Sequence, residues 1–347
     1  MKINCKQPIF FERNRVGRVY KGGKLFHDLF GDAPEDTHMP EEWIASSVAA
    51  YSEDGMATEG LSVIEGTGVT FDALLRQNRE ELLGDRQDLG ILVKYLDSAI
   101  RLPVQAHPDK EFSKAYFGSP YGKTEAWLIL GFRPGAKLYL GFNRQVSREE
   151  FSAAIEKSKT DKEIMAGFLR EVSVSLGDVF LIPARCVHAV GYGCLILEVQ
   201  EPTDFTVEPE YWCGDYPLTE HKMYMGLDKE TALGVFDFSI CGPDSEKRAR
   251  KIPEQTAKTD DFICESLISY KDTPCFAINR YIVTGSFAVP RGPSVWIVVD
   301  GKGTLFGDEY NRQIKKGNYF FLSHASRIVS VKAEKKITLI ECLPPKE

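Results

Sequence analysis

The sequence predicts a mainly β protein built from two β-barrels, with helical insertions in the first. Short apolar segments separated by Gly and Pro recur in residues 172–199 and again in 262–342, as strands of a barrel or sandwich do. A weak internal repeat supports two copies of one unit, because residues 177–188 can be laid on residues 317–328. The 347 residues, 43% of them hydrophobic, are enough for two such cores.

Three helical insertions are expected between the strands of the first unit. Residues 71–84 have helical spacing and end at Gly84, which favours a helix stop. Residues 147–170 open with the capping-box pattern Ser147-Arg-Glu-Glu150. Residues 218–233 give a third helical stretch.

Composition limits the partners of the chain. The net charge is −7 and there is no basic block, which argues against nucleic acid. The eight cysteines form no C-x-x-C pair, as expected of reduced thiols in a cytoplasmic protein. The N-terminal segment is polar, and no run approaches the roughly 20 apolar residues that cross a bilayer. We expect a cytoplasmic protein with no membrane partner.

Four side chains that can bind a divalent metal flank the predicted strands. Gln105 and His107 are two residues apart and therefore leave a strand on the same face. Glu125 opens one apolar run, and His188 precedes another. Taken singly, each is more often a polar strand residue, a solvated carboxylate or a hydrogen-bonded core imidazole. If the strands are neighbours, the four side chains converge, and their N and O atoms suit zinc with open positions for water or substrate.

The internal repeat separates a ligand role from a purely structural one. Alignment of the two copies places Ser294 on Glu125 and Ile328 on His188, while the apolar scaffold is kept. A fold-stabilising role alone does not predict that both polar residues change together. We therefore predict a metal in the first barrel only.

The predicted domains follow from the repeat. Residues 1–240 form the metal-binding barrel with its helical insertions, and residues 241–347 form a linker and a second, metal-free barrel. The linker is placed at 246–261, which is charged and rich in turn residues.

Six segments of the chain form an ordered set of motifs. They are Leu92-Val-Lys-Tyr-Leu-Asp97, Val104-Gln-Ala-His-Pro-Asp109, Gly122-Lys-Thr-Glu-Ala-Trp127, Gly177-Asp-Val-Phe-Leu-Ile-Pro183, Val187-His-Ala-Val-Gly191 and Leu197-Glu-Val-Gln200. In this order they resemble the type I mannose-6-phosphate isomerases of the bacterial, shorter-chain kind, a family with two cupin domains, which are jelly-roll β-barrels. The resemblance covers most of the chain and is strongest from about 90 to 206.

The resemblance implies a zinc-dependent aldose–ketose isomerase that interconverts mannose 6-phosphate and fructose 6-phosphate. One Zn²⁺ per chain is expected, and the residues that match the family's metal ligands are Gln105, His107, Glu125 and His188.

Three further residues match polar positions of the family's active site. Lys123 matches an active-site lysine, and Glu198 and Asp204 match acidic residues after the last histidine. We expect Lys123 and Glu198 in catalysis and Lys123 and Asp204 in substrate binding. From the residues alone, Lys123 as an exposed cation or a partner of a nearby acid, and Glu198 as a buried hydrogen-bonding residue, remain alternatives, and the proton-transfer base stays open.

The chain departs from the family at two places. Glu208 lies where the family usually has an arginine, and the family's Trp-Gly-Gly element reads Tyr20-Lys-Gly-Gly. A carboxylate near a phosphate repels it and cannot stabilise a developing enediolate as a cation does. We therefore expect weak activity on mannose 6-phosphate or a different substrate, with Glu208 in contact with it. Arg185 is the first candidate for a compensating cation.

Two alternative functions remain open. One is an isomerase of another sugar, including an unphosphorylated one whose hydroxyls Glu208 would bind. The other is a non-catalytic cupin that binds sugar and has a regulatory role. All three candidate functions imply a small sugar or sugar phosphate as the partner. None of them determines the oligomeric state.

Overall fold

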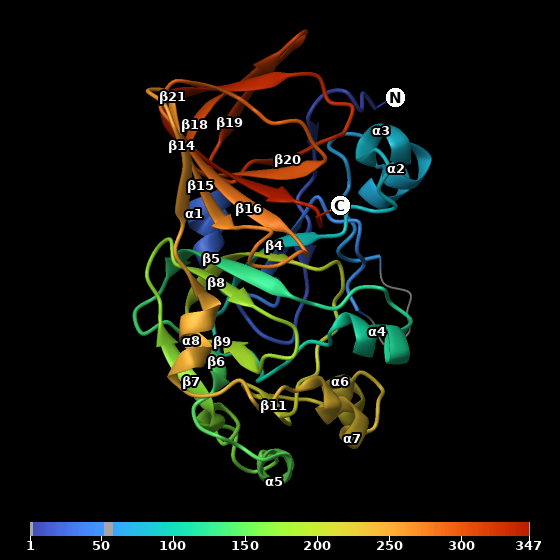
Figure 1. Ribbon diagram of the computed structural model, residues 1–347, viewed down its shortest axis with the longest axis vertical. Helices are drawn as coiled ribbons and strands as arrows, with labels where there is room; N and C mark the ends of the chain where they lie inside the picture. Colours follow the sequence, from blue (N-terminus) through green and yellow to red (C-terminus); the bar gives the residue numbers. More distant parts are fainter. Residues whose placement is uncertain (1–2, 52–57, 347) are drawn as a thin grey trace.

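Two β-rich units lie one above the other in the computed structural model, which describes residues 3–51 and 58–346 (Figure 1). The orange and red strands of the C-terminal part form the upper unit, and the green strands form much of the lower one. The predicted mainly β fold class is confirmed.

The first unit is built on one large antiparallel sheet and a smaller one. In spatial order, the large sheet consists of β13 (Arg250–Lys251), β8 (Val179–Ile182), β5 (Glu125–Phe132), β10 (Cys194–Gln200), β4 (Leu92–Asp97), β3 (Glu41–Ile44) and β2 (Arg15–Val16). The smaller sheet consists of β7 (Leu169–Ser173), β6 (Lys137–Phe142) and β9 (His188–Val190).

The second unit is a single antiparallel sheet. Its main path runs through β1 (Ile9–Phe10), β20 (Tyr319–Leu322), β18 (Ser294–Gly307), β21 (Val329–Leu343), β16 (Ala277–Val283), β15 (Phe262–Ile268) and β14 (Glu254–Lys258). Two further strands pair with it, β17 (Ser286–Ala288) on β21 and β19 (Tyr310–Lys315) on β18.

The strand register repeats between the two units. In the first, Trp127 of β5 lies opposite Glu198 of β10. In the second, Trp296 of β18 lies opposite Glu341 of β21. These are the pairs that the internal repeat aligns, so its prediction of two copies of one unit is borne out by the pairing.

Helices and short strands occupy the connections. They are η1 (Lys24–Phe26), α1 (His27–Phe30), α2 (Phe71–Gln77), α3 (Arg79–Leu83), α4 (Lys110–Phe117), α5 (Arg148–Lys157), η2 (Ala166–Phe168), β11 (Trp212–Cys213), β12 (Tyr216–Pro217), α6 (Glu220–Tyr224), α7 (Lys229–Ala232), η3 (Leu233–Val235) and α8 (Pro243–Ala249). The helices α5, α6 and α7 gather at the end of the first unit that is remote from the second (Figure 1).

The helix expected over 147–170 is wrong in its length. It begins as predicted, because the Ser147 hydroxyl accepts the Glu150 N–H, but α5 ends at Lys157. The Ser158 hydroxyl then donates to the Ile155 carbonyl at 2.7 Å, and turns follow. Residues 169–173 form β7, which buries Leu169 and Val172 and pairs with β6.

The segment expected as a linker, 246–261, is ordered into both units. It contains the end of α8 and then β13, which pairs with β8 of the first unit, and β14, which pairs with β15 of the second. The N-terminal strand β1 also crosses over, since Ile9 pairs with Phe321 of β20. The division into 1–240 and 241–347 therefore remains a proposal, with β1 lending a strand to the second unit.

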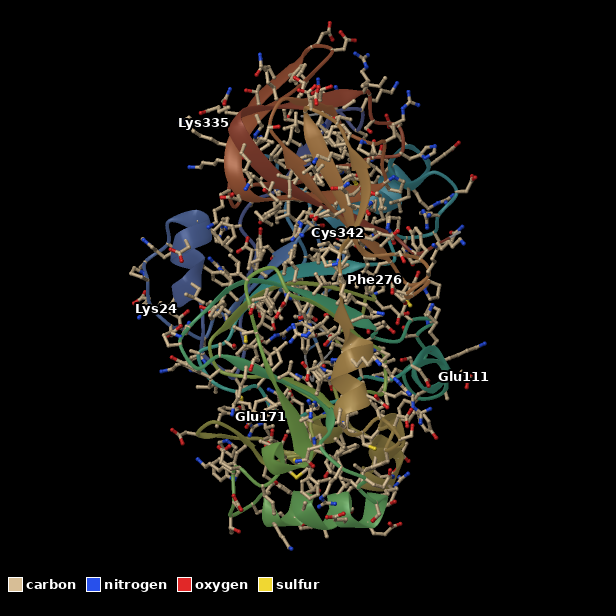
Figure 2. The ribbon with its side chains drawn as sticks, turned by 60° about the vertical axis from the view of Figure 1, so that its left-hand side comes forward. Lys24, Glu111, Glu171, Phe276, Lys335 and Cys342 are labelled. Atoms are coloured by element: carbon tan, nitrogen blue, oxygen red, sulfur yellow. The ribbon has the colours of Figure 1, made fainter. Side chains whose placement is uncertain are left out.

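A hydrophobic core fills the contact between the units. Phe276 and Cys342 of the second unit are buried in it, and Figure 2 shows both near the middle of the molecule. From the first unit, alternate residues of β5 join this core, including Ala126 and Leu128. Because side chains alternate along a strand, the opposite face of β5 points into the first barrel. That face is free to carry polar groups.

Candidate active site

Strand alternation directs three charged side chains into the first barrel. On β4 the interface residue Tyr95 follows Lys94, on β5 the interface residue Ala126 follows Glu125, and on β10 the interface residue Leu197 precedes Glu198. All three charged residues are at most 4% exposed. The sheet thus holds two carboxylates and an ammonium group together away from bulk water.

Backbone hydrogen bonds bring Gln105 and His107 to the same place. The Gln105 N–H donates to the His188 carbonyl at 2.9 Å, and the His188 N–H donates back to the Gln105 carbonyl at 2.9 Å. Ala106, between the two, forms a second bridge with Val207. The 105–107 segment is therefore held between β9 and the chain that follows β10.

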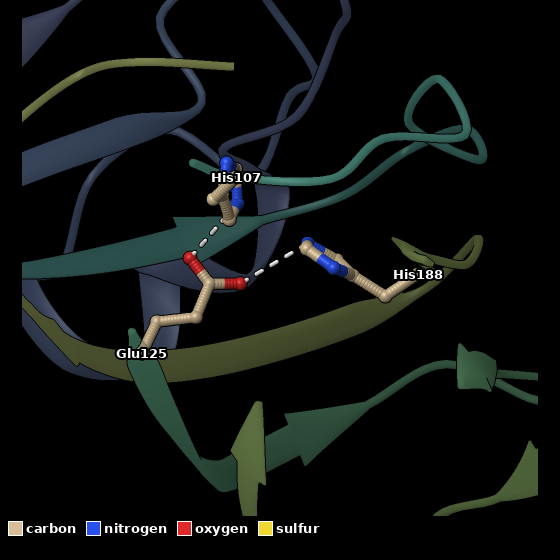
Figure 3. Close-up of side chains that lie close together, drawn as sticks. All are labelled: His107, Glu125 and His188. Carbon is tan, nitrogen blue, oxygen red and sulfur yellow. Dashed lines mark ion pairs between the residues drawn. The ribbon is translucent and has the colours of Figure 1, made fainter. Parts of the chain in front are cut away.

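His107, Glu125 and His188 converge on one point, as Figure 3 shows. The Nε2 atom of His107 lies 3.2 Å from Glu125 Oε2, and the Nε2 atom of His188 lies 3.2 Å from Glu125 Oε1. All three side chains are buried, and their potential ligand atoms lie within 4.8 Å of one another.

The second nitrogen of each ring fixes which atom faces Glu125. His107 Nδ1 is 2.9 Å from the Phe205 carbonyl, and His188 Nδ1 is 2.9 Å from the Cys186 carbonyl. A carbonyl only accepts, so each Nδ1 carries the proton and each neutral ring presents a lone pair at Nε2. Burial, followed by the charge of Lys123, lowers the pKa of His107 to about 3, in keeping with a neutral ring.

This donor set fits a divalent metal ion. Two imidazole lone pairs facing a carboxylate are all acceptors, and Glu125 Oε2 and His188 Nε2 are buried without a hydrogen-bond donor in the described part of the chain. A cation bound between them satisfies these atoms at once. Burial acts to raise the pKa of Glu125, but its charged and polar neighbours, the Lys123 ammonium among them, hold it well below its ordinary value, so the carboxylate is ionised.

A cavity of about 640 Å³ opens beside this cluster. Of the residues predicted to bind the metal or the substrate or to act in catalysis, all except His188 line it, and His188 contacts one of them, Glu125. The lining residues among them are Gln105, His107, Lys123, Glu125, Glu198, Asp204 and Glu208.

Lys123 and Glu198 are both buried next to the cluster. The Lys123 ammonium donates to His107 Nε2 at 3.1 Å and lies 3.5 Å from Glu125 Oε2, so it is a partner of a buried acid and not an exposed cation. Glu198 lies 3.5 Å from the Lys94 ammonium. Burial raises the pKa of Glu198 to about 8, against the opposing charge of Lys94.

Arg18, Glu41 and Lys94 complete the site and were not expected from the sequence. Arg18 pairs with Glu41 at 3.0 Å and with Asp204 at 3.3 Å, and Lys94 lies 3.7 Å from Glu41. Burial acts to raise the pKa of Glu41, yet Arg18 and Lys94 hold it well below its ordinary value. One signal was available, since a lysine inside the apolar run of β4 requires a buried partner.

Tyr20 also belongs to this group. Its hydroxyl donates to Glu41, which also accepts the Trp43 indole N–H at 2.7 Å. The tyrosine in Tyr20-Lys-Gly-Gly therefore contributes a hydrogen-bond donor to the cavity wall.

Glu208 lines the cavity, and Arg185 does not compensate for it there. Burial raises the pKa of Glu208 to about 7, opposed by the charge of Lys222. The Arg185 guanidinium pairs instead with Asp109 at 3.2 Å and donates to the Gly234 carbonyl. The expectation for Arg185 is wrong, because these partners hold it away from the cavity lining.

Within residues 3–51 and 58–346, no helix is long and apolar enough to cross a membrane.

Known proteins share both the sequence and the fold of this chain. It is 30% identical over 326 residues to the mannose-6-phosphate isomerase ManA of Bacillus subtilis, a match that spans 92% of this chain and 93% of that protein. It is 26% identical over 332 residues to the probable mannose-6-phosphate isomerase GmuF of the same organism, spanning 91% and 93%. No family model matches the chain.

Solved structures give the same fold. The crystal structure of mannose 6-phosphate isomerase from Bacillus subtilis has a TM-score of 0.76 at 21% identity and covers 97% of this chain and 99% of its own. A variant of phosphomannose isomerase from Salmonella typhimurium has a TM-score of 0.73 at 15% identity, covering 98% and 100%. The family resemblance carried by the sequence motifs is confirmed, and the chain belongs to the mannose-6-phosphate isomerase family.

Proposed function

We propose that this chain is a zinc-dependent isomerase that interconverts mannose 6-phosphate and fructose 6-phosphate. The observation that carries the proposal is the convergence of His107, Glu125 and His188 beside a cavity that the first two line, in a chain of this family. Gln105 would provide the fourth ligand, because it lines the same cavity and its backbone is bridged to His188. Zinc accepts such a mixed N and O set.

The reaction moves a proton between C1 and C2 of an open-chain sugar and another between the two neighbouring oxygens. When bound, the metal supplies a Lewis acid and a template for the sugar oxygens. The chain supplies buried groups that can give or take a proton, and Lys123 and Glu198 are the two that flank Glu125. Exclusion of water by the barrel keeps their charges effective.

Asp204 and Glu208 would both contact the substrate. They differ in that Asp204 is already paired with a cation of the protein and Glu208 is not. Asp204 is already bound to Arg18 and accepts the Tyr51 N–H at 2.9 Å, so it orients the cavity wall as well as offering a free lone pair. Glu208 makes no ion pair with a described residue and can accept from a sugar hydroxyl.

Glu208 also sustains a second candidate function. A carboxylate in the cavity is compatible with an unphosphorylated sugar, either as the substrate of an isomerase or as the ligand of a regulatory cupin. The slow turnover of mannose 6-phosphate expected from the sequence remains a prediction.

A coupled assay separates these functions. The full chain, loaded with zinc, is given mannose 6-phosphate or mannose, and formation of the ketose is followed. Turnover of mannose 6-phosphate that is lost in Glu125→Gln and kept in the exposed control Glu111→Gln supports the proposal. Turnover of mannose alone supports the second candidate. Binding of sugar without turnover of either supports the regulatory role.

A further inference from the structure

The cavity contains several cations, and three of them are committed to carboxylates. Arg18 pairs with Glu41 and Asp204. The two buried lysines are committed as well, one to Glu41 and Glu198 and the other to Glu125. Each of these positive charges is largely neutralised inside the protein, so none is free to meet the two negative charges of a phosphoryl group.

Lys222 is different. It lines the same cavity and is partly buried, and it forms no ion pair with any residue in the described ranges. Its backbone is fixed in α6, where its N–H donates to the Thr219 hydroxyl at 3.3 Å. Its ammonium lies 5.8 Å from the ring centroid of Tyr216, a neutral partner that leaves its charge intact. Lys222 is therefore a cation positioned at the cavity with no carboxylate holding it.

A continuous series of hydrogen bonds connects Lys222 to the metal-binding cluster. The segment of Gln105 and His107 is bridged to the next segment through Ala106 and Val207. The following residue, Glu208, donates its N–H to the carbonyl of Met223, the neighbour of Lys222 in α6, at 2.8 Å. The backbone of Lys222 is therefore held in place relative to the metal-binding cluster by the segment that contains Val207 and Glu208.

Glu208 lines the same cavity as Lys222 and explains why a cation is needed at this place. Its carboxylate repels the phosphoryl group of a bound sugar phosphate. The charge of Lys222 is the largest influence that opposes the effect of burial on Glu208. The charge of Lys222 therefore acts on the Glu208 carboxylate, although the two side chains form no direct ion pair.

We propose that Lys222 binds the phosphoryl group of the substrate and sets the preference for a phosphorylated over an unphosphorylated sugar. The assignment rests on the proposed function. An ammonium group gives charge-assisted hydrogen bonds to phosphate oxygens and can follow the group on its flexible stem. Its attraction for the phosphoryl group offsets the repulsion from Glu208 within the same cavity.

The test uses the full chain loaded with zinc and measures binding of mannose 6-phosphate, inorganic phosphate and mannose by calorimetry, together with the kinetics. Lys222→Met is expected to weaken binding of mannose 6-phosphate and phosphate by about 10- to 100-fold. Binding of mannose stays unchanged, and KM rises while kcat stays within about threefold. Lys222→Arg restores most of the affinity. Lys157→Met, which removes an exposed lysine at the end of α5, is the matched control and leaves all values unchanged.

The outcomes separate the two proposals. Unchanged affinity for mannose 6-phosphate and phosphate in Lys222→Met overturns the assignment, and ordinary turnover in the same variant leaves the proposed function standing. Selective loss of phosphate affinity in a protein that isomerises no sugar supports the assignment and refutes the proposed function. Absence of any binding of mannose 6-phosphate or phosphate to the unaltered protein overturns both. Equal thermal midpoints of all variants show that folding is not the cause.

Discussion

Gln105 and His188 exchange both of their backbone hydrogen bonds, at 2.9 Å each. This pair joins the segment that carries the first two candidate ligands to the strand that carries the last. The geometry of the site is therefore set by the main chain, before any metal binds. A site of this kind presents its ligand atoms without a large rearrangement.

Removal of one imidazole is expected to abolish metal binding. His188→Ala takes away one of three converging donors and leaves Glu125 Oε1 without its neighbour. Elemental analysis should find about one metal per unaltered chain and almost none in the variant. The control is His324→Ala, an exposed histidine of the second unit, which should keep its metal. A normal metal content in His188→Ala would place the site elsewhere.

Lys94 is expected to stabilise the fold as well as the site. It lies between two buried carboxylates, Glu41 and Glu198, and Lys94→Met leaves both without this cation. The loss of unfolding free energy should be about 3 kcal/mol, measured by urea denaturation. Lys137→Met, which breaks a surface pair with Glu171, should cost less than about 1 kcal/mol. Equal losses of unfolding free energy in Lys94→Met and Lys137→Met would mean that the fold does not depend on the buried charge of Lys94.

Glu208 is expected to make stability fall with pH. Its pKa is raised from 4.5 to about 7, chiefly by burial, so the folded state keeps a proton that the unfolded chain releases. Stability therefore declines as pH rises from about 4.5 to about 7, and the loss is complete above that window.

The variant Glu208→Gln tests this sign. Its unfolding free energy should equal that of the unaltered protein near about pH 4 and exceed it by about 1–2 kcal/mol near about pH 8, since the side chain is partly exposed. The exposed control Glu111→Gln should show no such change. A gain that shrinks with rising pH would contradict the account.

Ser294 is expected to have a structural role in place of the ligand role of Glu125. Its hydroxyl accepts the Trp296 indole N–H at 2.8 Å, and both side chains are fully buried. Ser294→Ala should lower the unfolding free energy by about 1–3 kcal/mol because the indole N–H loses its acceptor. Metal content should not change. Thr304→Ala removes an exposed hydrogen bond with Gln313 and should have little effect. Loss of metal from Ser294→Ala would contradict a structural second unit.

The sequence was sufficient for the features that leave a local pattern. Gln105 and His107 share a face because strand side chains alternate, and Glu125 with Ser294 marks where the two copies differ. Strand β1 left no such trace, because two residues that pair with β20 at the far end of the chain have no periodicity to detect. The end of α5 was also missed, since a single hydroxyl at Ser158 and the turns after it outweigh the helical spacing beyond.

The contribution of the N-terminal region to the site could not be predicted. Arg18 and Glu41 enter the cavity through pairings with residues that are distant in sequence, such as Asp204. A charged residue in a turn-rich segment looks like a solvated surface group until the fold shows what it faces. The role of Lys222 could not be predicted either. It is inferred from the ion pairs that the other cations of the cavity form with carboxylates.

Zinc titration of the metal-stripped protein, with mannose 6-phosphate as substrate, tests the central claim most directly. The stripped protein should be inactive, and turnover should rise with added zinc and saturate at about one equivalent per chain. Full turnover of mannose 6-phosphate by the stripped protein, or no turnover with one zinc bound, would contradict the central claim.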